Sequence, residues 1–202
     1  MSILDIPVDR RATELNVKYL PHLSINGVIF GLPGPGERET RLHVLIAKFM
    51  SESPSGLPVA YVPRELSLDE TASRTFSELL GVQSLPLAEV GAFGAPDRVS
   101  DPDFVAALSR LLEMSPDHWI FGRVVSIAYA ALVRIEETRI HLSAGMQSHQ
   151  WIPVGDIPEL MLDHAEMVDR PAGGLDRFHL GLVGGGDRLG AAKPGEVDVI
   201  GA

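Results

Sequence analysis

Hydrophobic and polar residues alternate along the chain in patterns that predict both strands and helices. Runs rich in Val, Ile, Leu and Phe predict strands. Two of these runs, at 42–50 and 124–133, are apolar at odd and even positions alike, so we expect both in the interior of a sheet. Residues 1–20 show little periodicity and predict an irregular lead-in. The predicted strands are 23–32, 42–50, 58–62, 87–94, 124–133 and 138–143.

A helix with a signal at each end is predicted directly after the 58–62 strand. Ser67 can act as its N-cap with Glu70 three residues later, which is a capping box. Gly81 stands where a left-handed residue ends a helix. Between these ends, apolar residues recur at helical spacing and predict one buried face. These residues are Leu68, Ala72, Phe76 and Leu80.

Two more helices are predicted further along the chain. Asp101 can cap a helix that has Pro102 at its first position and ends near Met114. Asp156 can cap another helix that runs to residue 170. From Pro171 onward, repeated glycines predict a flexible or extended tail. The first of the two helices has an apolar stripe made of Phe104, Leu108, Leu111 and Leu112.

Composition narrows the classes of function. The chain has 202 residues, 45% of them hydrophobic and 22% charged, which is typical of a soluble globular domain. It has no cysteine, which excludes disulfides, thiolate metal sites and a cysteine nucleophile. A net charge of -10 disfavours sequence-independent binding of nucleic acid. No apolar run is long enough to span a bilayer, and the first residues lack a signal-peptide pattern, so we expect a cytoplasmic protein with no membrane contact.

Residues 57–82 resemble a Nudix box, whose pattern is G-x5-E-x7-R-E-U-x-E-E-x-G-U. The pattern's glycine is replaced by Ala60, and three of its four glutamates are replaced by Leu66, Thr75 and Leu79. The resemblance implies an α/β Nudix fold, in which a mixed sheet lies between helices in an α/β/α arrangement. The matching residues are Leu57, Pro58, Arg74, Phe76, Glu78, Gly81 and Val82.

Three further segments are similar to the Nudix-like domain of NrtR-type regulators of NAD metabolism. They read FGAPDR at 93–98, GRVVSIAYAALV at 122–133 and QWIPVGDIPELMLDHAEMV at 150–168. The resemblance implies a nucleotide-like ligand of the ADP-ribose kind. It also implies a homodimer or a subunit of a larger complex.

The resemblance divides the chain into a lead-in (1–20), a Nudix-like domain (21–170) and a Gly-rich tail (171–202). A helical insertion at 99–121 separates two of the similar segments, and it could cover the ligand cleft, form an association surface or cap the sheet. NrtR-type regulators carry a winged-helix DNA-binding domain where this chain has its tail. We therefore expect no direct DNA binding.

Nudix chemistry depends on carboxylates that hold divalent metal. Mg²⁺ prefers carboxylate oxygens, and positions 75, 78 and 79 lie close enough on a helix to converge on one metal cluster. Only Glu78 is acidic among them, so it is the sole catalytic and metal-ligand candidate from this helix, and we expect no resident cofactor. Arginines suit diphosphate recognition through paired hydrogen bonds. The ligand-binding candidates are Tyr61, Arg74, Phe93, Asp97, Arg98, Arg123, Asp163 and His164.

Three hypotheses stay open at this point. The first is a binding or regulatory protein that recognises a nucleoside diphosphate or a partner protein, with little hydrolase activity. The second is a divergent Mg²⁺-dependent hydrolase in which other acids join Glu78, and the third is a structural subunit of a larger assembly. Each candidate residue could equally have a purely structural role, in a packed helix or a surface ion pair. The acids that could join Glu78 are Asp97, Asp103 and Asp163.

Overall fold

The computed structural model describes residues 6–34, 41–49, 54–99, 102–142 and 146–173, together with the backbone of 182–183. Asp101 and most of the predicted tail lie outside these ranges. The elements in chain order are α1 (Val8–Lys18), β1 (Tyr19–Leu32), β2 (His43–Lys48), β3 (Val59–Pro63), α2 (Leu68–Leu80), β4 (Ala88–Phe93), α3 (Pro102–Leu112), η2 (Trp119–Phe121), β5 (Val125–Arg134), η3 (Ile135–Glu137), β6 (Ser148–Pro153), η4 (Val154–Asp156), α4 (His164–Ala172) and β7 (Leu182–Val183).

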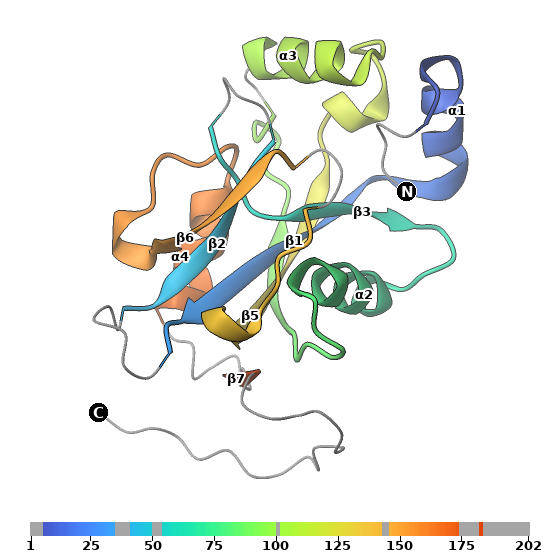
Figure 1. Ribbon diagram of the computed structural model, residues 1–202. Helices are drawn as coiled ribbons and strands as arrows, with labels where there is room; N and C mark the ends of the chain where they lie inside the picture. Colours follow the sequence, from blue (N-terminus) through green and yellow to red (C-terminus); the bar gives the residue numbers. More distant parts are fainter. Residues whose placement is uncertain are drawn as a thin grey trace.

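A mixed β-sheet forms the centre of the molecule (Figure 1). Its strands follow the order β4-β5-β1-β2-β6, with β3 paired to β1 and β7 paired to β5. β1 and β5 run parallel, whereas the pairings of β1 with β2 and of β2 with β6 are antiparallel. β2 and β5, the two strands with apolar residues at odd and even positions alike, lie inside the sheet as predicted.

Two helices cover opposite faces of this sheet, and the alternation of side chains along β1 decides which residues meet each helix. Ile25 and Ile29 point to one face and share a core with Phe76 of α2. Val28 points to the other face and shares a core with Met167 of α4. The predicted α/β/α arrangement is therefore confirmed.

Local signals define α2 as predicted. The hydroxyl of Ser67 accepts a hydrogen bond from the Glu70 backbone N–H at 3.2 Å, and the Glu70 carboxylate accepts one from the Ser67 N–H at 2.9 Å. Gly81 ends the helix with φ of 66° and ψ of 31°. An N-cap of this kind contributes about 1 kcal/mol.

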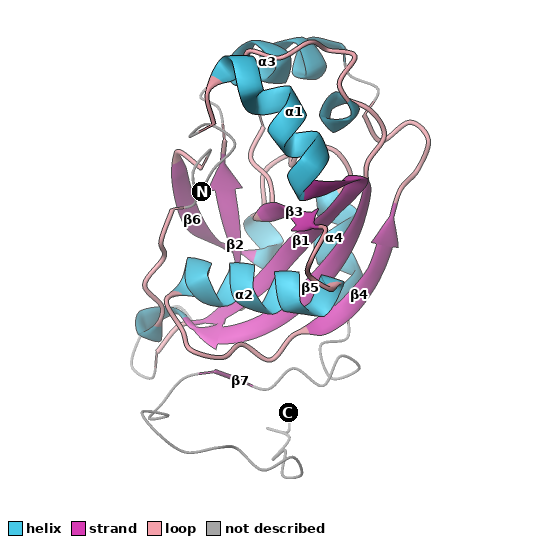
Figure 2. Cartoon of the chain, turned by 90° about the vertical axis from the view of Figure 1, so that its right-hand side faces the viewer, coloured by secondary structure: helices cyan, strands magenta, loops and turns pink. Residues whose placement is uncertain are grey.

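A third hydrophobic cluster joins α1, α3 and η2, which lie together beyond one end of the sheet (Figures 1 and 2). Leu15 of α1 packs there with Leu112 and Phe121. The buried guanidinium of Arg11 donates to the backbone carbonyls of Ile6 and Leu112 and so ties α1 to the end of α3. The predicted irregular lead-in is wrong, because residues 8–18 form a helix that this cluster stabilises.

Two other predictions are wrong for reasons outside the local sequence. Residues 138–142 form no strand, because the backbone N–H groups of Arg139 and His141 donate to carbonyls at the end of α2. The strand in this part of the chain is β6, which pairs with β2. The last helix does not start at Asp156, which closes the short turn η4; it starts at His164. No helix within the described residues is long and apolar enough to cross a membrane.

We predict that Gly27→Ala destabilises the fold. A Cβ at position 27 would lie 2.7 Å from the ring of Phe76, which is fully buried between β1 and α2. Relief of this overlap requires a shift in the core, so the free energy of unfolding should fall by roughly 1–3 kcal/mol in urea titrations. Gly155→Ala is the matched control, because no atom lies within 4 Å of its added Cβ. Equal stability of the two variants would contradict the described packing.

Candidate functional site

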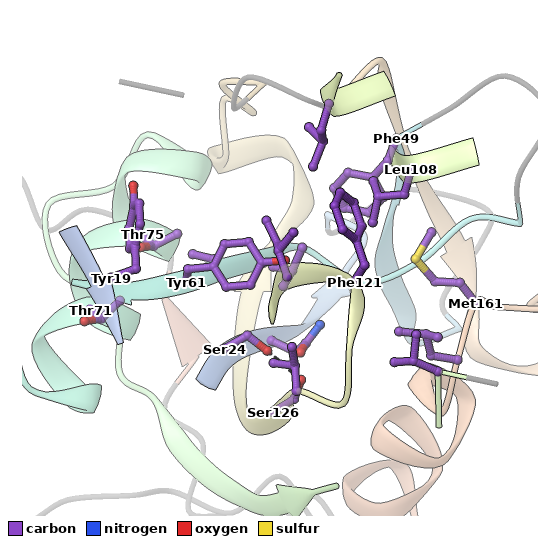
Figure 3. Close-up of a pocket in the computed structure, with 18 of the residues that line it drawn as sticks. Tyr19, Ser24, Phe49, Tyr61, Thr71, Thr75, Leu108, Phe121, Ser126 and Met161 are labelled. Atoms are coloured by element: carbon purple, nitrogen blue, oxygen red, sulfur yellow. Dashed lines mark hydrogen bonds between the residues drawn. The ribbon is translucent and has the colours of Figure 1, made fainter. Parts of the chain in front are cut away.

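A cleft of about 790 Å³ opens between the sheet, α2 and α3. Its volume is that of a small-molecule site. Figure 3 shows Thr71 and Thr75 on one side of the cleft, Met161 on the other, and Ser24 beside Ser126 at its base. The residues that line the cleft therefore come from elements that are distant in the sequence.

One wall of the cleft is hydrocarbon. α3 directs Phe104, Val105 and Leu108 toward it, and these side chains are only half-buried in the chain. Phe49 and Phe121 extend the same apolar wall (Figure 3). Of the roles open to the predicted insertion, covering the cleft is the one that this geometry supports.

The exposed side of α2 forms another wall. Arg74, Thr75 and Glu78 line the cleft, and Nε of Arg74 lies 3.1 Å from the Glu78 carboxylate. Both side chains are 70% exposed, so this ion pair contributes little to stability. Leu79 is 5% exposed and packs in the core under α2, away from the cleft. The expected convergence of positions 75, 78 and 79 therefore fails at position 79.

Arg98 lies at the base of the cleft with its side chain 2% exposed. It donates two hydrogen bonds to the Asp163 carboxylate, at 3.0 and 2.6 Å. Its remaining bonds go to the Val124 carbonyl at 2.6 Å and the Ser126 hydroxyl at 2.9 Å. The paired donors predicted to bind a diphosphate are therefore directed at Asp163, and both residues hold the base of the site together.

His164 is buried beside them at the first position of α4. Its Nδ1 accepts a hydrogen bond from the Leu57 backbone N–H at 3.0 Å, and its Nε2 lies 3.3 Å from the Asn26 carboxamide. Burial lowers the pKa of His164 to about 4; the nearby Arg98 acts in the same direction, and Asp163 opposes it. The imidazole is consequently neutral at physiological pH.

Aromatic side chains pack around the end of the cleft next to α1. Tyr61 lines the cleft and packs edge-on against Trp119, with ring centroids 5.3 Å apart. The indole N–H of Trp119 donates to the Asn16 side chain at 2.7 Å. Burial raises the pKa of the Tyr61 phenol, so the hydroxyl stays protonated and can donate a hydrogen bond.

Four predicted site residues do not line the cleft, and one of them is Asp163, which reaches the site only through its ion pair with Arg98. Phe93 is buried in the core on the α4 side, where the Arg170 guanidinium lies 4.3 Å from its ring centroid. Asp97 is exposed, and Arg123 is exposed with its guanidinium bonded to the Gly94 carbonyl. Adjacency in a sequence motif placed these residues near the site but could not show where their side chains point.

Three residues at the base of the cleft were missed. Ser24, Asn26 and Ser126 are buried polar residues within strands β1 and β5. A polar residue in an otherwise apolar strand was the available signal, because such a group must find a partner when buried. The Ser24 and Ser126 hydroxyls lie 2.7 Å apart.

Comparison with known structures identifies the architecture. The NUDIX domain of Shewanella oneidensis NrtR, solved in complex with ADP ribose, is 19% identical over 77% of this chain and 89% of that domain, with a TM-score of 0.54. A mutT/nudix family protein from Listeria innocua is 18% identical over 78% of this chain and 96% of its own, also with a TM-score of 0.54. This chain has the Nudix fold.

The match covers only part of the longer relative. Intact Shewanella oneidensis NrtR aligns over 77% of this chain but 63% of its own length, at 19% identity and a TM-score of 0.56. No protein-family model matches the sequence, and no curated protein is detectably similar to it in sequence. The predicted Nudix fold is confirmed by structure alone.

The replaced positions of the Nudix box fall into two groups in this fold. Ala60, Leu66 and Thr75 line the cleft, whereas Leu79 belongs to the core. Within the described residues, no three His, Asp or Glu side chains are placed to hold a metal ion. Glu78 and Glu65 are the carboxylates that line the cleft there. These residues do not fit the Mg²⁺ site that Nudix hydrolysis requires.

We predict that His164 makes stability depend on pH. Its folded pKa of about 4 lies below its ordinary value of 6.5, so the unfolded chain takes up a proton first as the pH falls. The stabilisation is fully present above pH 6.5 and is lost as the pH falls toward 4, by up to roughly 3 kcal/mol. In urea titrations at several pH values, His164→Gln should lose this part of the slope. His141→Gln, at an exposed histidine, should keep it; a wild-type slope in His164→Gln would contradict the assignment.

Proposed function

We propose that this Nudix-fold chain binds a nucleoside diphosphate of the ADP-ribose kind and hydrolyses it poorly or not at all. One observation carries the proposal: the cleft is intact, but the helix that should supply its metal ligands presents one carboxylate, Glu78, which is paired with Arg74. The fold has therefore kept a ligand-sized site without the groups that activate water.

The walls of the cleft suit such a ligand. Arg74 is exposed at the cleft, and its weak surface pair with Glu78 can be exchanged for a bidentate pair with a phosphate. Lys18 lines the cleft as well and can add a second positive charge. The apolar wall formed by α3 can cover a flat ring. The ADP ribose complex of the NrtR NUDIX domain, which shares the fold, supports this ligand class.

The alternative, a hydrolase with a rebuilt metal site, lacks support from the positions of the acids proposed for it. Asp97 and Asp103 are exposed and do not line the cleft. Asp163 is bonded to Arg98, and breaking a buried pair of this kind costs roughly 3–5 kcal/mol. A binding or regulatory role is the better match to the site.

The test is a calorimetric titration of ADP-ribose into the purified protein, with Mg²⁺ or with EDTA. We predict equal affinity in both, and hydrolysis slower by orders of magnitude than metal-assisted chemistry allows. Arg74→Met should weaken binding at least about tenfold, the worth of a charge-assisted hydrogen bond. Arg139→Met, at an exposed arginine outside the cleft, is the matched control. Rapid turnover with Mg²⁺ or Mn²⁺ that Glu78→Gln abolishes would overturn the proposal.

We extend the proposal to assembly. The chain should form a homodimer or join a larger complex, and with a net charge of -10 it should not bind duplex DNA by itself. Light scattering at micromolar concentration should give at least twice the 21.8 kDa mass of one chain. A clean monomer with no co-purifying partner would contradict this.

A further inference from the structure

Asn26 lies at the base of the cleft and is completely buried. In the structure its Nδ2 lies 3.3 Å from Nε2 of His164, and its Oδ1 has no partner among the described residues. Buried polar side chains in proteins are almost always paired, so this atom marks a place where something else binds.

The hydrogen bonds of His164 decide which amide atom meets it. Nδ1 accepts from the Leu57 backbone N–H and therefore carries no proton. A neutral imidazole then has its proton on Nε2, which is a donor. Two donors cannot bond to each other, so the Asn26 amide must be turned over, which exchanges Nδ2 and Oδ1 and presents the oxygen to this N–H. The unpartnered group of Asn26 is therefore its NH₂, a hydrogen-bond donor.

The neighbouring hydroxyls of Ser24 and Ser126 also provide a hydrogen-bond donor that has no acceptor. Ser126 accepts from Arg98, and the Ser126 and Ser24 hydroxyls share one hydrogen bond. Each serine hydroxyl carries one proton, and only one of the two protons is used in the bond between Ser24 and Ser126. The other proton is therefore free to be donated, whichever serine is the donor in that bond. Both serines line the cleft beside Asn26, so a ligand that binds at the base of the cleft should carry a hydrogen-bond acceptor there.

The acceptor belongs to an uncharged part of the ligand. Arg98 is already neutralised by Asp163, so the base of the cleft has no spare positive charge for a buried phosphate. Phe121 and α3 place hydrocarbon in the same cleft. An uncharged ring with acceptor atoms on its edge, such as a nucleobase, satisfies both surfaces.

We propose that Asn26 selects the ligand of this cleft by donating from its NH₂ to the acceptor edge of an uncharged ring, while the diphosphate stays at the exposed side near Arg74. This inference rests on the proposed function and specifies how the ligand is oriented. Asn26 is a ligand-contacting residue in this assignment, and His164 is the residue that positions it.

The test uses nuclear magnetic resonance on the full chain. Asn16 and Asn26 are the only asparagines, so the side-chain NH₂ signal lost in Asn26→Asp identifies Asn26. The probes are ADP-ribose and uncharged adenosine, and either should shift this signal. Nitrogen shifts of His164 should show a proton on Nε2 and none on Nδ1.

Affinity gives the second readout. Asn26→Asp keeps the shape of the side chain and its acceptor for His164 but replaces the donor, so ADP-ribose should bind about tenfold more weakly or worse. Asn16→Asp is the matched control, since Asn16 lies outside the cleft and keeps its acceptor for the Trp119 indole. If Asn26→Asp does not fold, the shift of the Asn26 signal in the wild-type chain on addition of each probe decides whether Asn26 contacts the ligand.

The outcomes separate the two proposals. Binding of ADP-ribose with an unmoved Asn26 signal would overturn the role of Asn26 and leave the proposed function standing. A shift with adenosine but no binding of ADP-ribose would support the role of Asn26 and overturn the diphosphate ligand. An Asn26 signal that neither probe moves would overturn the role of Asn26.

Discussion

The ion pair between Arg98 and Asp163 is the interaction on which the site depends. It joins the turn after β4 to the residue before α4, and the other donors of Arg98 hold Val124 and Ser126 at the start of β5. Three segments distant in sequence are thereby fixed around one guanidinium. A buried charge pair with every oxygen and nitrogen engaged is costly to form but costlier to break, so it fixes one arrangement of the base of the cleft.

This ion pair fixes the start of α4, and the start of α4 in turn positions residues that line the cleft. Because Asp163 is held, the next residue, His164, is fixed where its two nitrogens reach Leu57 and Asn26. The first contact sets the segment that leads into β3, and the second orients a carboxamide in β1. Burial keeps the imidazole neutral, and a neutral imidazole can both accept and donate. Fold stability and ligand selection at Asn26 therefore share one hydrogen-bond network.

The sequence predicted what local chemistry determines. α2 carries its own caps and apolar face, and β5 has apolar residues at both odd and even positions, so both elements were correctly placed. Arg74 and Tyr61, two of the ligand-binding candidates named from the sequence, line the cleft. The failures are non-local: residues 138–142 bond to the end of α2 instead of pairing as a strand. Likewise, nothing near Arg98 in the sequence shows that Asp163, 65 residues later, would engage its guanidinium.

Leu79 departs from the Nudix pattern at a position that the core of this fold depends on. In the Nudix pattern this position is a glutamate, but here the side chain is 5% exposed and packed with the core under α2. Burying a leucine contributes about 1.5–3 kcal/mol, whereas a carboxylate in the same surroundings would have to be desolvated without a partner. Thr75 and Leu66 line the cleft, so acids could return there without disturbing the core. Position 79 is different, because this chain has used it to pack α2, and a metal site could be rebuilt there only by repacking that helix.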